Sequence, residues 1–366
     1  MMADLNAPLE REIRRIISVA GAMPVSEYMA LCLGHPEHGY YMTRDPLGAQ
    51  GDFTTAPEIS QMFGELIGLW SAAAWHHMGK PEAVNLIELG PGRGTMMNDA
   101  LRAAKVLPGF RNAVKLHLVE ISPALQKRQR QSFEGVDVHV TWHESLNDVP
   151  DGPCIILANE FFDALPVHQA VRTDGAWHER VIAIDDNDEL AFGAAREPLA
   201  HFEKFLPPQI RSAPDGSVFE WRNDAAAYEI GRRLARDRGV ALIIDYGHER
   251  SDIGDTLQAV SGHTYSDPLI GPGLADITAH VDFQALAAAT DSIGARVHGP
   301  LEQGEFLRRL GIANRANALK ANAAHRSEEI DAAVARLTGA GTENMGRLFK
   351  VLGLSHGDLK ALPGFD

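Results

Sequence analysis

Cysteine is scarce in this sequence, because its 366 residues include only Cys32 and Cys154. The two lie far apart along the chain and in apolar surroundings, so the sequence predicts buried, reduced thiols. A small secreted domain held together by disulfides is therefore not expected.

Long apolar runs are also lacking, and none approaches the roughly 18 residues that span a bilayer. The first twenty residues contain Asp4, Glu10 and Glu12 and no apolar core segment. That composition is typical neither of a secretory signal nor of an acid-poor transit peptide. These absences predict a soluble protein located in the cytoplasm.

Positive charge is in deficit, with 34 Lys and Arg against 49 Asp and Glu and a net charge of −15. This balance argues against nucleic acid or an anionic membrane as the main partner, since both select for basic surfaces. The apolar content of 45% is ample for one large core, or for a core with a smaller subdomain.

One pair of histidines suggests a metal site. His35 and His38 form a candidate pair, but Pro36 lies between them and no third ligand of suitable type is near. We therefore expect a polar turn at this position and no metal site.

The most informative stretch is 85–95, Asn-Leu-Ile-Glu-Leu-Gly-Pro-Gly-Arg-Gly-Thr, which runs from an apolar strand through a glycine-rich turn into a helix. Glycines at 90, 92 and 94 remove Cβ atoms where such a turn needs positive φ and where a ligand comes close to the backbone. The next predicted strand, 115–120, ends in the carboxylate of Glu120, which can accept two hydrogen bonds from ribose hydroxyls. The stretch therefore indicates a nucleotide-containing ligand.

The spacing favours S-adenosylmethionine over a dinucleotide. A dinucleotide fingerprint has its third glycine five positions after the first, where this chain has Thr95, and its acidic residue about twenty positions on. Glu120 instead lies 30 positions after Gly90. An adenosyl sulfonium carries no phosphate and is better served by acidic neighbours such as Glu88. The pattern resembles the first two motifs of class I methyltransferases.

The order of elements predicts an α/β fold with a doubly wound, mostly parallel sheet. The predicted strands are 84–89, 115–120, 136–141, 154–158, 240–245, 295–299 and 348–354. The predicted helices are 9–20, 95–106, 123–132, 223–237 and 282–293, with two or three more between 302 and 338.

Three helix starts carry capping signals. Ser26 is a candidate N-cap, and Ser122 before Pro123 is another. Thr55 and Glu58 have the spacing of a capping box, which predicts a firm helix to about Met78. The preceding loop, 51–55, is a candidate cover for a bound cofactor, with an ordinary capped loop as the alternative.

An antiparallel insertion is predicted between the fourth and fifth core strands. The alternating segments 167–172 and 177–185 flank Asp174-Gly175, a strong hairpin signal, and 189–194 and 218–221 add strands. The predicted regions are 1–80, N-terminal helices and covering loop; 81–166 and 222–300, core; 167–221, an inserted β flap; and 301–366, added helices and a final core strand.

Polar residues follow the continuously apolar strand 154–158, as expected at the end of a parallel strand covered on both faces. Asn159, Glu160 and Asp163 come directly after it. An open α/β sheet places its site at the carboxyl ends of its strands, so these residues are site candidates.

Five motifs occur in order along nearly the full chain: Gly51-Asp52-Phe53-x-Thr55-x-Pro57-Glu58-Ile59-Ser60-Gln61-x-Phe63-Gly64-Glu65, Glu88-Leu89-Gly90-Pro91-Gly92-x-Gly94, Asn159-Glu160-Phe161-Phe162-Asp163-Ala164-Leu165-Pro166, Ile244-Asp245-Tyr246-Gly247 and Asp276-Ile277-Thr278-x-His280-Val281-Asp282-Phe283. Together they resemble the MidA family. That resemblance implies S-adenosylmethionine as cofactor. Its mitochondrial members are protein arginine methyltransferases needed for assembly of respiratory complex I, so it also implies a protein partner, a subunit of that complex.

The resemblance also implies a set of cofactor contacts. In methyltransferases of this layout, the turn after the third strand touches the adenine edge, and a plain surface turn is the alternative here. Asn159 with Phe162 resembles the Asn-Pro-Pro-aromatic signature of amino-group methyltransferases, without its prolines. The cofactor candidates are Thr55, Glu88, Gly90, Pro91, Gly92, Gly94, Glu120, Ser145, Leu146 and Asn159.

Arginine methylation places demands on the catalytic residues. A protonated guanidinium is a poor nucleophile, so carboxylates must hold it by bidentate hydrogen bonds with one nitrogen directed at the methyl group. Glu160 and Asp163 are the best-placed pair, although Glu160 could instead cap the following turn. His280 is a candidate proton acceptor, with a structural hydrogen bond as the alternative.

Other functions stay open at this point. A methyltransferase acting on a small amine is the nearest alternative, and a non-catalytic assembly factor with a vestigial cofactor fold is another. A nicotinamide dehydrogenase is disfavoured by Thr95 and by the distant Glu120. Fold class alone decides among none of these.

Overall fold

The computed structural model describes residues 8–43, 54–262 and 264–365. The chain divides into two compact units, each assembled from three segments. The first unit takes the described parts of Met1–Phe53, Asp163–Asn223 and Arg250–His280, and the second those of Thr54–Phe162, Asp224–Glu249 and Val281–Asp366.

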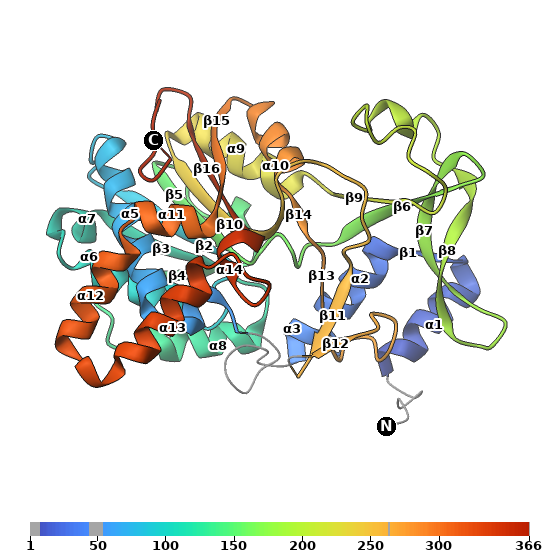
Figure 1. Ribbon diagram of the computed structural model, residues 1–366, viewed down its shortest axis with the longest axis horizontal. Helices are drawn as coiled ribbons and strands as arrows, with labels where there is room; N and C mark the ends of the chain where they lie inside the picture. Colours follow the sequence, from blue (N-terminus) through green and yellow to red (C-terminus); the bar gives the residue numbers. More distant parts are fainter. Residues whose placement is uncertain (1–7, 44–53, 263, 366) are drawn as a thin grey trace. The chain divides into compact units, whose positions relative to one another are not determined.

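The second unit is built on an eight-stranded sheet in the order β15-β16-β10-β5-β2-β3-β4, with β14 paired to β10 (Figure 1). The strands are β2 (Val84–Leu89), β3 (Val114–Val119), β4 (Val140–His143), β5 (Cys154–Asn159), β10 (Val240–His248), β14 (Val281–Asp282), β15 (Ala295–Glu302) and β16 (Phe349–His356). Strands β4, β3, β2, β5 and β10 run parallel, and β16 is antiparallel to its neighbours β10 and β15.

The strand order reverses at β2. From β2 the chain moves outward through β3 to β4 and then returns to the other side of β2 as β5. Open α/β sheets bind ligands at such a switch point, beyond the carboxyl ends of the strands. The ends of β2 and β5 are therefore the expected place for a site.

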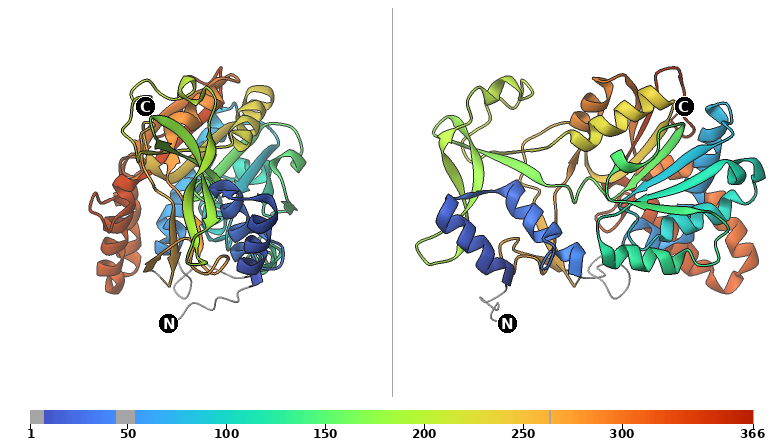
Figure 2. Two further views of the ribbon diagram at one scale, coloured as in Figure 1. Left: turned by 90° about the vertical axis from the view of Figure 1, so that its right-hand side faces the viewer. Right: turned by 180° about the vertical axis from the view of Figure 1, so that it is seen from behind.

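Helices cover both faces of this sheet. Leu86, Leu157 and Leu242 pack in one apolar core with side chains of α5, α6 and α11 to α13, while Figure 2 shows α9 on the other side of the sheet from α12 and α13. The helices are α4 (Ala56–Ile59), α5 (Gln61–His77), α6 (Thr95–Ala104), α7 (Pro108–Ala113), α8 (Pro123–Ser132), α9 (Ala225–Asp237), α10 (Phe283–Asp291), α11 (Gln303–Arg309), α12 (Ile312–Asn322), α13 (Ser327–Thr338) and α14 (Met345–Leu348), with short 3₁₀ turns η1 (Leu146–Asp148) and η3 (Ala324–Arg326).

The first unit combines N-terminal helices with two antiparallel sheets. One sheet has the order β1-β7-β6-β9, with β8 on β7, and the other has the order β12-β11-β13. Leu9 and Ile13 of the first helix share a core with Val167 and Ile182 of the larger sheet. The elements are α1 (Pro8–Ala20), β1 (Met23–Pro24), α2 (Val25–Gly34), α3 (Tyr40–Thr43), β6 (Val167–Thr173), β7 (Ala176–Ile184), β8 (Leu190–Pro198), η2 (Phe202–Lys204), β9 (Val218–Arg222), β11 (Gln258–Ser261), β12 (Thr264–Ser266) and β13 (Asp276–Thr278).

The predicted hairpin is confirmed. Strands β6 and β7 pair antiparallel around Asp174 and Gly175, whose φ angles of 52° and 78° are both positive. A two-residue hairpin turn of type I′ requires this conformation at both central residues.

Two predicted capping interactions are wrong, although helices do begin next to both residues, at Val25 and at Ala56. Ser26 lies inside α2, whose N-cap is Pro24, and its hydroxyl is 3.2 Å from Nδ1 of His168. The capping box at Thr55 and Glu58 does not form: within the described residues the Thr55 side chain makes no capping bond, and α4 ends after one turn. Glu58 fails to close the box because its carboxylate accepts the hydroxyl of Thr95 at 2.6 Å.

The long helix α5 starts at a residue that the pattern did not mark. Ser60 has an extended backbone and its side chain accepts the backbone N–H of Met62, so it is the N-cap. The third core strand also begins at Val140, four residues later than predicted, and the short strands β11 to β13 were not predicted at all. Strands of three or four residues are too short to show a clear alternation.

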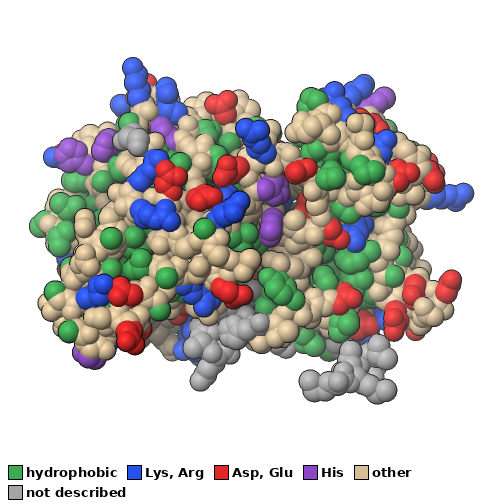
Figure 3. All heavy atoms as spheres, in the orientation of Figure 1, with side chains coloured by type: hydrophobic (Ala, Val, Ile, Leu, Met, Phe, Trp, Pro, Cys, Tyr) green, Lys and Arg blue, Asp and Glu red, His purple; other side chains and the backbone are tan. Residues whose placement is uncertain are grey.

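Charged side chains of both signs lie on the surface. Acidic and basic side chains are interspersed over the face shown in Figure 3. Across the described ranges, none of the helices combines the length and the apolar character that a membrane crossing needs. His35 lies in a polar turn, where its Nδ1 accepts the N–H groups of Glu37 and His38.

Candidate active site

The glycine-rich turn leads directly from β2 into α6. Gly90, Gly92 and Gly94 have φ angles of 62°, 54° and 80°, so all three adopt the left-handed conformation that the sequence predicts. Pro91 lies between the first two, and its carbonyl accepts the N–H of Gly94 at 2.8 Å. The turn therefore exposes backbone where a side chain would be strained.

The turn also leaves no room for larger residues. A Cβ on Gly90 would lie 3.0 Å from the ring of Phe161, and a Cβ on Gly94 would lie 2.9 Å from the ring of Phe133. Both distances are shorter than ordinary carbon contacts. Glycine is thus required twice over, by conformation and by packing.

Glu88 is the penultimate residue of β2 and is 3% exposed. Its Oε2 has no hydrogen-bond partner among the residues that the structure describes. Burial raises the pKa of this carboxyl to about 8. An orphaned acid at the end of a central strand suits a ligand that brings a donor or a positive charge, as the α-ammonium or sulfonium of S-adenosylmethionine does.

Glu120 follows β3 and is also buried, but its carboxylate is held. Oε1 accepts the N–H of Ser122 at 2.8 Å and Oε2 accepts Nε2 of Gln129 at 3.1 Å. Burial raises the pKa of Glu120, and the hydrogen bonds from the Ser122 backbone and the Gln129 side chain oppose that rise. Each oxygen retains a lone pair, so the carboxylate can still accept ribose hydroxyls.

Ser145 and Leu146 lie in the turn after β4. Ser145 caps η1 by accepting the N–H of Asn147, and its own N–H donates to the carboxylate of Asp148. Leu146 is buried. The pair is therefore part of an ordered turn at the same edge of the sheet as the glycine turn.

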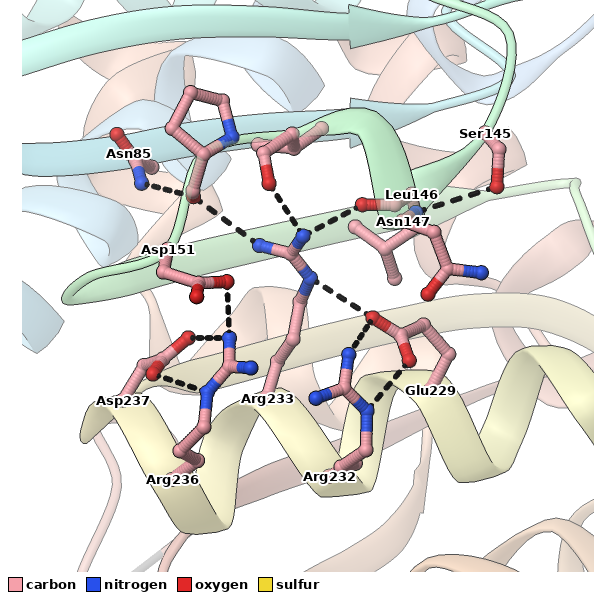
Figure 4. A network of polar contacts seen from close by, with 12 residues as sticks. Asn85, Ser145, Leu146, Asn147, Asp151, Glu229, Arg232, Arg233, Arg236 and Asp237 are labelled. Carbon is pink, nitrogen blue, oxygen red and sulfur yellow. Dashed lines mark hydrogen bonds and ion pairs between the residues drawn. The ribbon is translucent and has the colours of Figure 1, made fainter.

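A buried arginine forms hydrogen bonds with the backbone of this turn and of the residues after it. Arg233 of α9 is 1% exposed and donates to the carbonyls of Leu146, Val149 and Pro150 (Figure 4). Its Nε donates to Glu229 at 3.0 Å. Arg233 thus donates to three carbonyls of this segment, of which that of Leu146 also accepts the N–H of Val149 and that of Pro150 also accepts the side-chain amide of Asn85.

Glu160 directly follows the last residue of β5. Its φ is 52°, an uncommon value for a residue with a side chain, and its N–H donates to Ile244 of β10 at 2.9 Å. Its Oε1 accepts the N–H of Ala56, at the start of α4, and the side-chain amide of Asn159. Thr55 precedes Ala56 as the N-cap of that helix. The structure therefore brings Thr55, Asn159 and Glu160 together.

Asp163 and His280 belong to the first unit, whereas Glu160 belongs to the second. Arg222 of β9 donates to the carbonyls of Asp163, Ala279 and His280. The N–H of His280 donates to the hydroxyl of Thr256 at 2.9 Å. The main chain around both predicted residues is thus fixed by a neighbouring strand.

Three side chains that contact the candidate site residues were not predicted from the sequence. Gln129, Arg222 and Arg233 are polar side chains whose role depends on which loops the fold brings to them, and no spacing rule identifies such contacts. Gly51, Asp52 and Phe53, the start of the predicted covering loop, lie outside the described residues.

Comparison with known proteins supports the predicted cofactor and fold. Residues 66–301 match the model of a family described as putative S-adenosyl-L-methionine-dependent methyltransferases. A solved structure from Burkholderia thailandensis, bound to S-adenosyl-homocysteine, is similar with a TM-score of 0.84 and 31% identity, over 98% of this chain and 94% of that chain. The prediction of S-adenosylmethionine as cofactor is confirmed, as is a class I methyltransferase-like fold with mixed α/β sheets.

Curated relatives extend the similarity to most of the chain. The protein named protein arginine methyltransferase NDUFAF7 homolog, mitochondrial, of Drosophila melanogaster is 40% identical, over 97% of this chain and 86% of its own length. The Homo sapiens protein named protein arginine methyltransferase NDUFAF7, mitochondrial, is 37% identical over 83% of this chain and 74% of its own length.

These names overturn one prediction. The expected cytoplasmic location is contradicted, because these relatives are named as mitochondrial proteins. The composition of the first twenty residues speaks only to a targeting segment, so it could not establish the compartment. With 37 to 40% identity over most of its length and the family match over 66–301, the chain belongs to the S-adenosyl-L-methionine-dependent methyltransferase family of these relatives, and the resemblance to MidA proteins is confirmed.

Proposed function

We propose that this methyltransferase methylates an arginine guanidinium on a protein, and that the protein is a subunit of respiratory complex I during its assembly. The names of the relatives support arginine as the target. The complex I subunit follows from the resemblance of the five motifs to the MidA family.

The observation that carries the proposal is the backbone of Glu160. A non-glycine residue at φ 52°, directly after a central parallel strand, is conformationally costly, and such outliers cluster at functional sites. The N–H bond to Ile244 and the contacts of Oε1 hold the carboxylate in place. A preorganised carboxylate at this strand end suits a guanidinium.

The cofactor, when bound, would supply a methyl group activated by its sulfonium, with the thioether S-adenosylhomocysteine as the leaving group. Glu160 and Asp163 hold the guanidinium so that one nitrogen faces that methyl group, and His280 takes up the proton that the nitrogen loses. The hydrogen bonds that Oε1 of Glu160 accepts from Ala56 and Asn159 fix the orientation of this carboxylate.

The cofactor-binding roles follow the same edge of the sheet. Gly90, Pro91, Gly92 and Gly94 give backbone approach to the methionine part, with Glu88 facing its charge. Glu120 accepts the ribose hydroxyls, while Ser145 and Leu146 border the adenine and Thr55 and Asn159 complete the pocket.

Regional roles are also part of the proposal. The strands of 167–221 act as an inserted flap, and the helices of 1–80 and 301–366 are additions to a methyltransferase core formed by 81–166 and 222–300. The antiparallel pairing of β6, β7, β8 and β9 supports a separate role for the insertion.

The test uses Glu160→Gln, which keeps the side-chain shape and removes the charge. Calorimetry with S-adenosylhomocysteine measures cofactor binding, and mass spectrometry of purified complex I subunits, incubated with protein and S-adenosylmethionine, measures methylation. We expect unchanged cofactor affinity and a methylation rate lower by about a hundredfold, the typical cost of misplacing a reacting group.

The exposed Glu144→Gln serves as the matched control and should behave as the wild type. Methyl groups found on small amines but never on arginine would assign a different substrate. Normal complex I assembly with the Gln variant, without methylation, would favour a non-catalytic assembly factor.

A further inference from the structure

Gln129 lies on α8, the helix that follows Glu120, and its side chain is fully buried. Its Nε2 donates two hydrogen bonds, to the carbonyl of Gly92 at 2.8 Å and to Oε2 of Glu120 at 3.1 Å. One amide group therefore joins the glycine turn after β2 to the carboxylate after β3.

The orientation of this amide is fixed from the other side. The indole N–H of Trp142, on β4, donates to Oε1 of Gln129 at 2.9 Å. An indole nitrogen is a donor only, so it can face the amide oxygen but not the amide nitrogen. Both N–H groups of Gln129 must consequently point at Gly92 and Glu120.

These hydrogen bonds fix the orientation of the Glu120 carboxylate. Glu120 would otherwise be free to rotate about its last torsion, which is broad for a carboxylate. With Oε1 bound by the backbone of Ser122 and Oε2 by Gln129, the carboxylate plane is set, and the remaining lone pairs face away from these two donors.

We propose that Gln129 is a positioning residue for cofactor binding: it fixes the carboxylate of Glu120, relative to the glycine turn, in the orientation that accepts the ribose hydroxyls of S-adenosylmethionine. The inference rests on the role assigned to Glu120 above. It adds that the affinity for the sugar depends on a residue that touches no part of the cofactor.

A second glutamine on the same helix provides a matched control. Gln126 also contacts Glu120, but its Nε2 donates to the backbone carbonyl at 2.8 Å and not to the carboxylate. Gln126 is also partly exposed, whereas Gln129 is buried. The two residues thus separate a contact with the functional group from a contact with the main chain.

The experiment compares Gln129→Met with Gln126→Met. Calorimetry measures the affinity of the purified full chain for S-adenosylhomocysteine and for its analogue that lacks both ribose hydroxyls. For the wild type we expect the hydroxyls to contribute substantially. Gln129→Met should weaken S-adenosylhomocysteine binding roughly tenfold, as loss of one hydrogen bond to a charged group does, and leave binding of the dideoxy analogue nearly unchanged.

The ligand pair distinguishes positioning from a general packing defect. Equal weakening of both ligands by Gln129→Met, or no weakening of either, would overturn the proposal, because a disturbed core does not select for ribose hydroxyls. Gln126→Met should match the wild type with both ligands. A wild-type protein that binds S-adenosylhomocysteine and its dideoxy analogue equally would remove the role of Glu120 itself, which is a separate failure.

A second variant covers the case in which Gln129→Met does not fold. Trp142→Phe leaves Gln129 in place and removes the N–H that orients its amide, while a smaller aromatic ring remains beneath Arg130. We expect a smaller loss of affinity, about threefold, again confined to the ligand with hydroxyls. Unaltered affinity for both ligands in a folded Trp142→Phe protein, together with an unfolded Gln129→Met, would count against the proposal.

Discussion

Glu88 and Glu120 lie at the ends of two paired parallel strands, yet their surroundings differ. Both are almost fully buried, with exposed fractions of 3% and 7%. Glu120 accepts hydrogen bonds at both oxygens, whereas Oε2 of Glu88 has no partner within the described part of the chain. Burial raises the pKa of both carboxyls, and that of Glu88 reaches about 8. Two similarly buried residues therefore differ: the carboxylate of Glu120 is held in one orientation, and the carboxyl of Glu88 has an oxygen without a hydrogen bond in the described part of the chain.

The largest effect should come from removing the fixed carboxylate. Glu120→Ala deletes the acceptor for the ribose hydroxyls, and loss of two hydrogen bonds to a charged group corresponds to about a hundredfold weaker binding of S-adenosylhomocysteine. Calorimetry measures this loss, and Glu144→Ala is the exposed control. If Glu120→Ala retained its affinity for S-adenosylhomocysteine, Glu120 would not be the acceptor of the ribose hydroxyls.

A pH-dependent effect should come from Glu88. Because its pKa in the folded chain is about 8, against an ordinary value of 4.5, the folded chain retains a proton that the unfolded chain releases between these values. The free energy of unfolding should therefore fall as the pH rises through this window and level off above it.

Glu88→Gln should remove this slope. We expect the wild type to lose up to a few kcal/mol relative to the Gln variant between pH 5 and pH 8, from the size of the shift. Urea unfolding at a series of pH values measures the difference, with Glu144→Gln as baseline. Parallel curves for the wild type and Glu88→Gln would contradict this prediction, because they would show that the pKa of Glu88 is not raised in the folded chain.

The smallest effects concern the helix caps near these carboxylates. Ser122→Ala removes the side chain that accepts the N–H of Leu125 and should cost about 1 kcal/mol of stability. Thr55→Ala should change the free energy of unfolding by less than about 0.5 kcal/mol, since the Thr55 hydroxyl caps nothing within the described residues. Chemical unfolding compares the two, and a larger cost for Thr55→Ala would reverse the assignment.

The caps also show what the sequence can predict. Ser122 before Pro123 was predicted as an N-cap and is one, since its hydroxyl oxygen accepts the N–H of Leu125. Thr55 and Glu58 have equally suitable spacing, but Glu58 is taken by Thr95, which is remote in sequence. A local rule holds only where tertiary contacts do not compete for the same side chains.

The site shows the same division. The left-handed glycines at 90, 92 and 94 were predictable because steric limits on φ are local. The strands that carry Glu88, Glu120 and Glu160 were predictable from continuous apolar runs. Gln129 was not, since it lies in a polar helix and gains its partners only when the sheet brings the two strand ends together.

Arg222 sets a limit on how this chain could be shortened. Its guanidinium donates to the carbonyls of Asp163 and Leu165, which precede the antiparallel insertion. It also donates to the carbonyls of Ala279 and His280, which follow Arg222 by more than fifty residues. An engineered miniature that excises the insertion together with β9 would remove one donor from each of these carbonyls, of which that of Asp163 also accepts the N–H of Ala279. Any trimmed version therefore has to keep that guanidinium or rebuild the loop it binds.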